Sequence, residues 1–471
     1  MNSRGLTDLT AADLARLIAA KEVSPVQVTE AYLERIERLD SELGAYITVC
    51  GEEALEEARE AEKAVTRGDA LGPLHGVPLA VKDQFETQGI LTTAGSTILE
   101  DHIPKQDATV VARARTAGAI LLGKHNMTEF AAGLGDRFKY GEPKNPWDQT
   151  RSTGGSSTGS AIAVAASLCA MALGEDTGGS IRMPASLAGI VGVRPSWGLL
   201  SRSGVIPLCW SMDSAGPMTR TVEDAALLLG AIAGHDVGDP LTARLSIPNY
   251  SEGLRRDLEG IRIGLVEEFM GEFVDGEVID AIEAAASQLE TLGAVVERVS
   301  LPLASQMGPA MAVITGSAGA YVCREWLRDR PEDFGPALRR RWLAASLFPG
   351  QALEKASAMR ALLRREWYRL FEDFPVLISP TQANTAQKIR YETRITSEEE
   401  AERRFIWQRS TTHVAAMAGT PAMTVPCGFD SESLPIGLQI MTGRFQEDLM
   451  FQVGHAYEQS TDWHRRRPSV Q

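Results

Sequence analysis

The sequence lacks several features that would place a protein in a specialised class. Its five cysteines are widely spread and form no CxxC pair, so neither a disulfide framework nor a zinc site is indicated. Lysine and arginine number 47 against 62 aspartates and glutamates, a formal net charge of −15. Such an acidic chain is a poor ligand for phosphate backbones, which excludes sequence-independent nucleic-acid binding. No repeat or low-complexity tract separates independent domains.

Long apolar runs are also missing. The longest nearly apolar stretch, residues 161–173, is much shorter than the roughly 20 residues that a membrane-spanning helix needs. We interpret it as a single buried helix. The N-terminal residues show no apolar stretch followed by a small-residue cleavage site, so no signal peptide is expected. With unpaired cysteines, these observations predict a cytoplasmic protein without a membrane partner.

What remains is the composition of a large globular protein, with 44% hydrophobic and 23% charged residues. The first 70 residues predict a helical arm. Thr10 with Asp13 marks one helix start, and Ser24, Pro25 and Gln27 form a second capping box with proline at the first helical position. A charged helix then ends near residue 68.

From residue 71 the pattern changes to short apolar runs alternating with helical stretches, which predicts an α/β fold with one large sheet. Helical spacing without strand signals predicts a helical lid or insertion over 303–374, which could select the substrate. We expect one domain, with its core at 71–302 and 375–471. The predicted strands are 77–81, 119–123, 261–266, 294–299, 375–379, 423–426 and 436–440.

The segment 145–195 carries the most chemical information. Two glycine-serine turns, GGSST and GEDTGGS, bracket the apolar stretch, and a chain that returns along it would bring Ser156 and Ser180 together. A serine needs a neighbouring base and donors for the oxyanion. The turn 177–180 can supply a nucleophile together with backbone N–H groups that approach a ligand closely. A glycine-rich turn without chemistry is the simpler interpretation of such a segment taken alone.

Histidine does not supply an obvious base, because none of the seven histidines lies in a motif that ties it to a serine. Lys82 is the better choice. It follows the apolar run GVPLAV on a predicted strand, where burial would lower the pKa of its amine toward neutrality. A lysine at a strand end is more often solvated, so this role depends on context.

These residues resemble the amidase signature family. Its core reads Gly-Gly-Ser-Ser-Gly-Gly-Ser, an apolar helix, then Asp-Thr-Gly-Gly-Ser-Ile-Arg and Pro-Ala. The resemblance extends through GVPLAVKD, AGAILLGKHNMTEFA, NPWD, GPMTRTVEDAALLL, AGTPAMTVPCGF and LPIGLQIM, and so covers nearly the whole chain. It implies one large mixed sheet with helices on both faces.

The resemblance also implies the roles of individual residues. Ser180 would be the nucleophile, Ser156 the bridging serine after a cis peptide bond, and Lys82 the base. Amide cleavage would pass through an acyl-enzyme without a metal or cofactor. The oxyanion hole would use backbone N–H groups of Thr177, Gly178, Gly179 and Ser180, and the supporting residues would be Gly155, Ser157, Asp176 and Arg182.

Two departures from the family pattern concern the acyl pocket. Thr158 replaces a glycine, and GLGDRFKYGEP replaces a Ser/Thr/Asn-rich stretch before NPWD. Four further side chains suggest an apolar, aryl-accepting pocket, although they could equally be ordinary core: Met127, Cys209, Trp210 and Met212.

Three alternatives have some support. The sequence GSSTG fits the G-x-S-x-G elbow of α/β-hydrolases with Ser157 as nucleophile, but the polar residues before it oppose a buried strand there. A phosphate-binding loop lacks the Gly-Lys-Ser/Thr. Within the family, the amidase subunit of glutamyl-tRNA amidotransferase is a rival, and retention of the three catalytic residues disfavours a non-catalytic binding protein.

We therefore expect a stand-alone hydrolase of carbon–nitrogen bonds, acting on aryl amides and aryl carbamates (urethanes). Ester or urea hydrolysis would use the same tetrahedral chemistry. A small-molecule substrate is the expected partner, and a homodimer would be ordinary for such a family.

Overall fold

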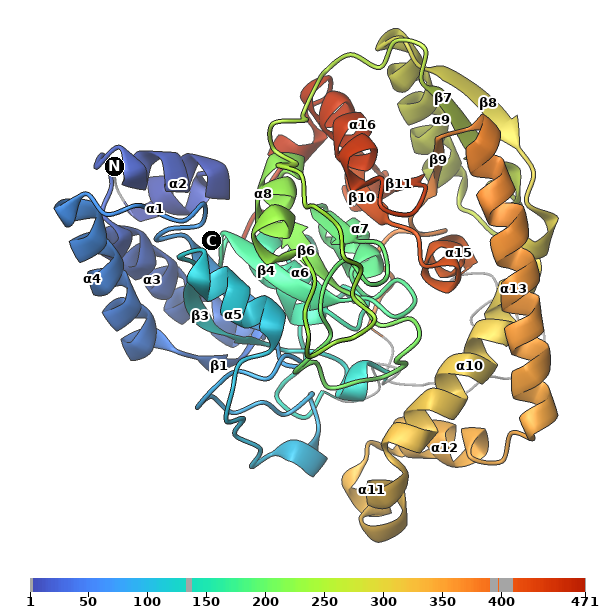
Figure 1. Cartoon of the computed structure of the whole chain (residues 1–471), viewed down its shortest axis with the longest axis horizontal. Helices are drawn as coiled ribbons and strands as arrows, with labels where there is room; N and C mark the ends of the chain where they lie inside the picture. The colour runs from blue at the N-terminus through green and yellow to red at the C-terminus, as the bar shows by residue number, and fades with distance from the viewer. Residues whose placement is uncertain (1–2, 133–137, 390–396, 398–409, 471) are drawn as a thin grey trace.

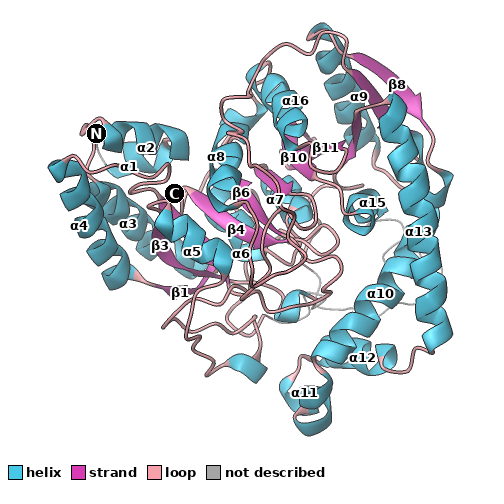
Figure 2. Cartoon of the chain, viewed as in Figure 1, coloured by secondary structure: helices cyan, strands magenta, loops and turns pink. Residues whose placement is uncertain are grey.

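The computed structural model describes residues 3–132, 138–389, 397 and 410–470, and within these it contains one mixed sheet of 11 strands. Figure 2 shows the strands crossing the molecule from β1 and β3, near the N-terminal helices, to β8 at the edge beside α9 and α13. The strands are β1 (Tyr46–Val49), β2 (Pro78–Lys82), β3 (Ile120–His125), β4 (Met171–Glu175), β5 (Val191–Arg194), β6 (Ala215–Thr219), β7 (Arg262–Val266), β8 (Val295–Val299), β9 (Val376–Pro380), β10 (Ala422–Phe429) and β11 (Pro435–Thr442).

The order across the sheet is β1-β3-β2-β4-β6-β5-β10-β11-β9-β7-β8. Strands from the C-terminal part therefore pair with strands of the first half, since β10 is antiparallel to β5. Strand β2 lies between two parallel neighbours, β3 and β4. This assembly from distant segments confirms the prediction of a single α/β sheet.

Four helices form the N-terminal arm, at one end of the molecule in Figure 1: α1 (Ser3–Asp8), α2 (Ala11–Ala19), α3 (Pro25–Leu43) and α4 (Gly51–Arg67). The caps expected from the sequence are present. Thr10 accepts the Asp13 N–H, and Ser24 and Gln27 make the capping box of α3. Helix α4 ends at Arg67, and Gly68 caps it with a left-handed φ of 78°.

Further helices pack on the two faces of the sheet. They are α5 (Thr109–Thr116), α6 (Thr158–Ala165), α7 (Arg182–Ala188), α8 (Val222–Ile232), α9 (Gly276–Thr291), α15 (Ser410–Ala418) and α16 (Glu447–Gln459). Helices α6 and α7 contact each other and the central strands. Helices α8 and α9 both contact α16, and together these three helices lie against β5, β6, β10 and β11.

The segment expected to be helical contains α10 (Met307–Val322), α11 (Arg324–Asp329), α12 (Pro336–Ala345) and α13 (Gly350–Asp373). These lie together at the end of the molecule opposite the N-terminal arm (Figure 1). Helices α10 and α13 pack on each other and on α15, with Trp342 and Trp367 fully buried among them. The segment is helical as expected, and its role as a lid stays a prediction.

The interpretation of residues 161–173 as one buried helix is wrong. Helix α6 ends at Ala165, the chain turns through Ser167 at a φ of 56°, and Met171 begins strand β4. A continuous apolar run has no periodicity that separates a buried helix from a strand covered on both faces. Strands β1, β5 and β6 were also missed: β1 has only four residues, and β5 and β6 contain glycine or proline, which weaken a strand pattern.

Among the described residues, no helix combines the length and the apolar character needed to cross a bilayer. Part of the stretch GLGDRFKYGEP, residues 133–137, lies outside the described residues.

Candidate active site

Lys82 is the last residue of β2, and its side chain is completely buried. Its Nζ lies 2.7 Å from Ser156 Oγ. The same Nζ lies 3.3 Å from the backbone oxygen of Glu175 and 3.2 Å from its Oε2. Burial lowers the pKa of Lys82, and the neighbouring Glu175 opposes this shift. The lysine thus lies in the desolvated environment that the sequence indicated.

Ser156 lies just before α6, and the peptide bond that joins it to Gly155 is cis. The N–H of Thr128 donates to the Ser156 carbonyl at 3.3 Å. A Cβ on Gly155 would stand 2.9 Å from the Thr128 methyl group, which explains why glycine occupies this position. The neighbouring chain therefore fixes Ser156 with its hydroxyl toward Lys82.

Ser180 lies in the loop between β4 and α7, and the N–H of Ser157 donates to its carbonyl at 3.1 Å. This hydrogen bond joins the two glycine-serine turns. Ser157 also bonds the Glu175 backbone through its hydroxyl, which contacts the carbonyl at 3.1 Å and the N–H at 3.2 Å. Ser157 thus ties the start of α6 to the end of β4.

This arrangement argues against the α/β-hydrolase alternative. The hydroxyl of Ser157 is engaged with the backbone of β4. The segment 145–157 forms no strand, whereas an elbow requires one before the serine. His125, the buried histidine nearest in sequence to these elements, contacts Ser160 and has a pKa lowered by burial to about 3.

Asp176 anchors the loop that carries Ser180. Its carboxylate accepts the N–H groups of Gly179 at 2.7 Å and Ile181 at 3.2 Å. Arg182 contacts it through Nε and Nη2, both at 3.0 Å, and Arg194 approaches at 3.1 Å. Burial alone would raise the pKa of Asp176, but the two arginines outweigh it and hold the pKa far below its usual range.

The backbone donors of this loop fall into two groups. The N–H of Gly179 points to Asp176, as just described. The N–H groups of Thr177, Gly178 and Ser180 make no hydrogen bond within the part of the chain that the structure describes. Three donors are therefore available within four residues of one loop.

The far side of the loop is covered by α10 and α15. A Cβ on Gly178 would clash with Met311 Cε and would stand 3.6 Å from the His413 ring. A Cβ on Gly179, whose φ is +127°, would clash with Thr412 Oγ1. Thr412 also donates to the Gly178 carbonyl at 2.8 Å. Glycine is required at Gly179, whereas a side chain at Gly178 would meet the flexible end of Met311, and the helical region contributes uncharged atoms to the surroundings.

The four expected pocket residues occupy different environments. Met127, Cys209 and Met212 are buried, and the N–H of Cys209 donates to Asp213 while the Met212 carbonyl accepts Arg194. Trp210 is 60% exposed. It stacks on the Arg202 guanidinium and lines a surface cavity of about 200 Å³ whose wall includes Asp213.

Sequence reasoning missed Glu175, which precedes the recognised DTGGS turn and faces Lys82 directly. It also missed Arg194 and Gln439, which reach the anchor of the loop from β5 and β11. The signal for Glu175 was an acidic residue at the end of the apolar run MALG, directly before Asp176. Arg194 and Gln439 carried no local signal, because their contacts are with residues 18 and 257 positions away.

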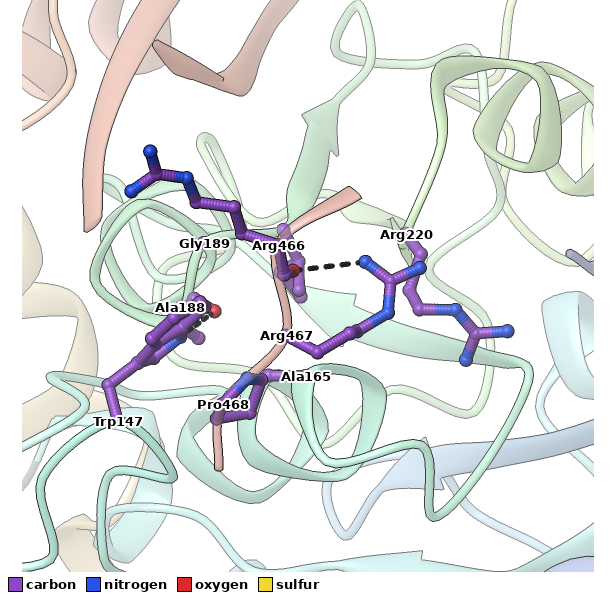
Figure 3. A pocket seen from close by; sticks show the side chains of 9 residues that line it. Trp147, Ala165, Ala188, Gly189, Arg220, Arg466, Arg467 and Pro468 are labelled. Atoms are coloured by element: carbon purple, nitrogen blue, oxygen red, sulfur yellow. Dashed lines mark hydrogen bonds between the residues drawn. The ribbon is translucent and has the colours of Figure 1, made fainter. Parts of the chain in front are cut away.

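A second cavity lies beside α6 and the C-terminal segment, lined by Trp147, Arg220, Arg466 and Arg467. Its volume of about 10 Å³ is room for roughly one water molecule. Figure 3 shows the side chain of Arg466 directed away from those of Arg220 and Arg467. The arginines do not converge on a common ligand position, so this cavity is not the active site.

Comparison with known proteins agrees with the architecture. A family model described as amidase matches residues 27–451. A glutamyl-tRNA(Gln) amidotransferase subunit of Thermosynechococcus vestitus is 40% identical, over 97% of this chain and 99% of its own. The same subunit of Moorella thermoacetica is 39% identical and covers 98% of both chains.

Solved structures give the same result. The peptide amidase of Stenotrophomonas maltophilia superposes with a TM-score of 0.86 at 33% identity, covering 98% of each chain. A 6-aminohexanoate cyclic dimer hydrolase reaches 0.89 at 28% identity, over 98% of this chain and 99% of its own. A protein from a complex linked to the evolutionary origins of an s-triazine catabolic enzyme superposes with a TM-score of 0.90 at 32% identity. The match covers 98% of this chain and 100% of that protein. The chain belongs to the amidase family, the amidase-signature enzymes that act on carbon–nitrogen bonds.

Proposed function

We propose that this amidase cleaves its substrate through an acyl-enzyme on Ser180, with Ser156 and Lys82 as the proton relay. The observation that carries the proposal is the 2.7 Å contact between Lys82 Nζ and Ser156 Oγ, in a site where the lysine is fully buried. A neutral amine in that position accepts a proton from the serine hydroxyl.

In the first half of the cycle, Ser180 Oγ attacks the carbonyl carbon and gives its proton to Ser156, while the Ser156 proton passes to Lys82. The negative oxygen of the intermediate is stabilised by the N–H groups of Thr177, Gly178 and Ser180. Gly179, expected to be a fourth donor, already donates to Asp176, so its role is to hold the loop in shape.

The relay then runs in reverse and protonates the leaving nitrogen, which an amide or carbamate requires because an amide anion is a poor leaving group. Water attacks the acyl-enzyme by the same route and frees the acid product. A carbamate that loses its amine would leave a carbonate ester on Ser180, and water would convert this ester to the free alcohol and CO2. Urea and ester substrates use the same steps.

For the acyl donor, we propose aryl amides and aryl carbamates. The residues that surround Gly178 and Gly179 are uncharged in type: Met311 comes from α10, Thr412 and His413 from α15, and Met183 from α7. None of these four is an arginine, lysine, aspartate or glutamate. Uncharged, partly apolar surroundings favour an uncharged acyl group over a zwitterionic one.

A glutamine side chain is the second candidate, and the sequence comparisons favour it. Relatives 39 to 40% identical over nearly the full length are subunits of glutamyl-tRNA(Gln) amidotransferase. In this case the chain would act as the glutaminase of an assembly and would need partner subunits. The stand-alone interpretation requires turnover by the purified chain.

The test is release of amine or ammonia from four substrates: an anilide, an aryl carbamate, an aliphatic amide and glutamine. We expect the aryl substrates to be turned over, and Ser180→Ala to reduce kcat/KM by about 10³-fold or more. Ser160→Ala is the matched control, because Ser160 is another buried serine, on α6, that contacts His125 and the Leu173 carbonyl. Activity confined to glutamine, or appearing only with added partner subunits, would establish the second candidate.

A further inference from the structure

Glu175, the last residue of β4, has both carboxyl oxygens engaged in the interior. Its Oε2 lies 3.2 Å from Lys82 Nζ, and its Oε1 lies 2.8 Å from Thr177 Oγ1. The side chain has no exposed surface. The carboxyl group therefore bridges the base of the relay and the hydroxyl of a residue in the oxyanion loop.

Thr177 contacts a second carboxyl group. Its Oγ1 lies 2.7 Å from Asp213 Oδ1. A hydroxyl has one proton, so it can donate to only one of the two carboxyl groups. The other contact is a hydrogen bond only if that carboxyl group is itself protonated and donates to the threonine oxygen.

The surroundings of the two carboxyl groups show which one receives the Thr177 proton. Asp213 accepts backbone N–H groups from Leu208 and Cys209, each at 2.9 Å. Backbone donors favour an ionised carboxylate. Glu175 Oε1 faces the threonine hydroxyl instead. The consistent assignment has Thr177 donating to Asp213 and protonated Glu175 donating to Thr177.

We propose that Glu175 is a positioning residue which stays protonated, donates to Thr177, and thereby leaves Lys82 as a neutral amine for the Ser156–Ser180 relay. This inference rests on the proposed function. The donors then run in one direction: Ser156 O–H to Lys82 Nζ, Lys82 N–H to Glu175 Oε2, Glu175 O–H to Thr177, and Thr177 O–H to Asp213.

The charges around Glu175 support this assignment. Lys82 faces it from β2, Asp176 and Asp213 from the adjoining loops, and Arg194 from β5. Burial raises the pKa of Glu175 to about 7, helped by Asp213 and Asp176 and opposed by Lys82 and by the hydrogen bond with Thr177. Burial also raises the pKa of Asp213, and the hydrogen bonds from Thr177, Cys209 and Leu208 oppose that rise.

The consequence concerns the acid side of the activity profile. If Glu175 lost its proton before Lys82 did, the resulting carboxylate would stabilise the protonated lysine. The relay would then be inactive until the pH was high enough to remove the proton from Lys82. A protonated Glu175 avoids this, because the pair then carries its single proton on the carboxyl group. The relay works at lower pH as a result.

The experiment breaks the link that Thr177 makes between Glu175 and Asp213. Thr177→Val keeps the backbone N–H and the shape of the side chain but removes the hydroxyl. Glu175 then loses its acceptor and ionises, so the acid midpoint of kcat/KM should move upward by about one pH unit or more. Thr177→Val combined with Glu175→Gln should return the midpoint to the wild-type position, because glutamine carries no charge.

Two single variants complete the design. Glu175→Gln alone mimics the protonated acid and should leave the acid midpoint in place, whatever its effect on the plateau. Thr92→Val is the matched control, because the Thr92 hydroxyl lies 2.6 Å from Nζ of another buried lysine, Lys124. A midpoint that moves downward by about one unit in Glu175→Gln, or no shift in Thr177→Val, would overturn the proposal.

A second measurement separates this inference from the proposed function. The rate of Ser180 modification by phenylmethanesulfonyl fluoride requires the relay but no particular amide substrate, and its pH dependence reports the same midpoint. If wild type is modified and the midpoints of all variants coincide, the Glu175 inference fails while the proposed function stands. If the reagent does not react with Ser180, the proposed function itself fails.

Discussion

Two buried lysines lie on adjacent strands of the same sheet, and each contacts a carboxyl group. Lys82 ends β2 and lies 3.2 Å from Glu175, while Lys124 lies on β3 and 3.0 Å from Asp83. Both lysines are fully buried. Burial lowers the pKa of each lysine, and the acidic neighbour opposes the shift in both cases.

The hydrogen bonds to the two acids differ. Asp83 Oδ2 accepts the N–H of Thr93 at 2.8 Å and also its hydroxyl, and such donors favour the charged form of a carboxyl group. Lys124 Nζ forms an ion pair with the other oxygen, Oδ1, at 3.0 Å. Glu175 contacts a hydroxyl that also bonds Asp213, which favours the neutral acid and the neutral amine.

The lesson is that desolvation alone does not make a lysine a base. Both lysines lose their water, but only Lys82 has a serine hydroxyl at 2.7 Å and an acid that can keep the proton. Lys124 contacts the hydroxyl of Thr92, which in turn donates to the Ile90 carbonyl. The partner of the lysine, and the donors to that partner, decide its protonation.

The largest expected effect is the loss of activity when each of the two lysines is replaced. Lys82→Met should reduce kcat/KM by about 10²–10⁴-fold, because the relay loses its proton acceptor. Lys124→Met should leave kcat/KM per folded molecule within about threefold of the wild-type value, since Lys124 takes no part in the relay. Steady-state kinetics corrected for folded protein measures both. A comparable loss in Lys124→Met would contradict the distinction between the two sites.

The free energy of unfolding should rank the two variants in the opposite order, with the larger loss in Lys124→Met. Lys124→Met leaves the Asp83 carboxylate buried without its counter-ion, which costs about 3–5 kcal/mol of unfolding free energy. Lys82→Met leaves a carboxyl group that can stay protonated, so its cost should be lower by about 2 kcal/mol or more. Urea unfolding at pH 6 compares the two variants. Equal losses would contradict a protonated Glu175.

The pH dependence of stability sharpens the comparison further. The folded pKa of Glu175 is raised to about 7, above its unfolded value, so folded molecules bind more protons at this residue between the two values. Stability from this group is present at low pH and is lost as the pH rises toward 7. In wild type, the lowered pKa of Lys82 makes the unfolding free energy rise with pH, and this offsets the loss that Glu175 causes.

Lys82→Met removes that compensation. Relative to wild type, its unfolding free energy should fall by about 1.4 kcal/mol for each pH unit between pH 5 and 7. Urea unfolding at several pH values measures the slope. Glu175→Gln is the control: its unfolding free energy should rise with pH relative to wild type, because only the titration of Lys82 remains. Parallel pH profiles for Lys82→Met and wild type would contradict the raised pKa.

Much of this site was predictable from sequence because its residues lie in short segments with strong local signals. Ser156 and Ser180 are fixed by glycine turns, and the apolar run before Lys82 indicates its burial. The fold class followed from alternating strands and helices. The 161–173 stretch was interpreted wrongly because a fully buried strand and helix share one apolar pattern.

The electrostatic partners of the site were harder to predict, for a physical reason. Asp213 meets Thr177 across 36 residues, and Arg194 reaches Asp176 from a strand formed later in the chain. Such contacts depend on which strands become neighbours in the sheet, and single-sequence patterns do not encode strand order. The charge state of Glu175 depends on three segments at once.

The smallest expected effect concerns Trp210, which lies near Asp213 at the outer end of the hydrogen-bond chain. Trp210 is 60% exposed, stacks on Arg202, and lines the cavity whose wall includes Asp213. Trp210→Ala should cost about 0.5–1 kcal/mol of unfolding free energy, as expected for an exposed cation–π contact. Because Asp213 is held by backbone donors rather than by the indole, the acid midpoint of kcat/KM should move by less than about 0.3 pH units. A pH titration of kcat/KM on this variant measures that midpoint. An upward shift of a full unit would mean that Trp210 shields Asp213 and that the chain of hydrogen bonds extends to the surface.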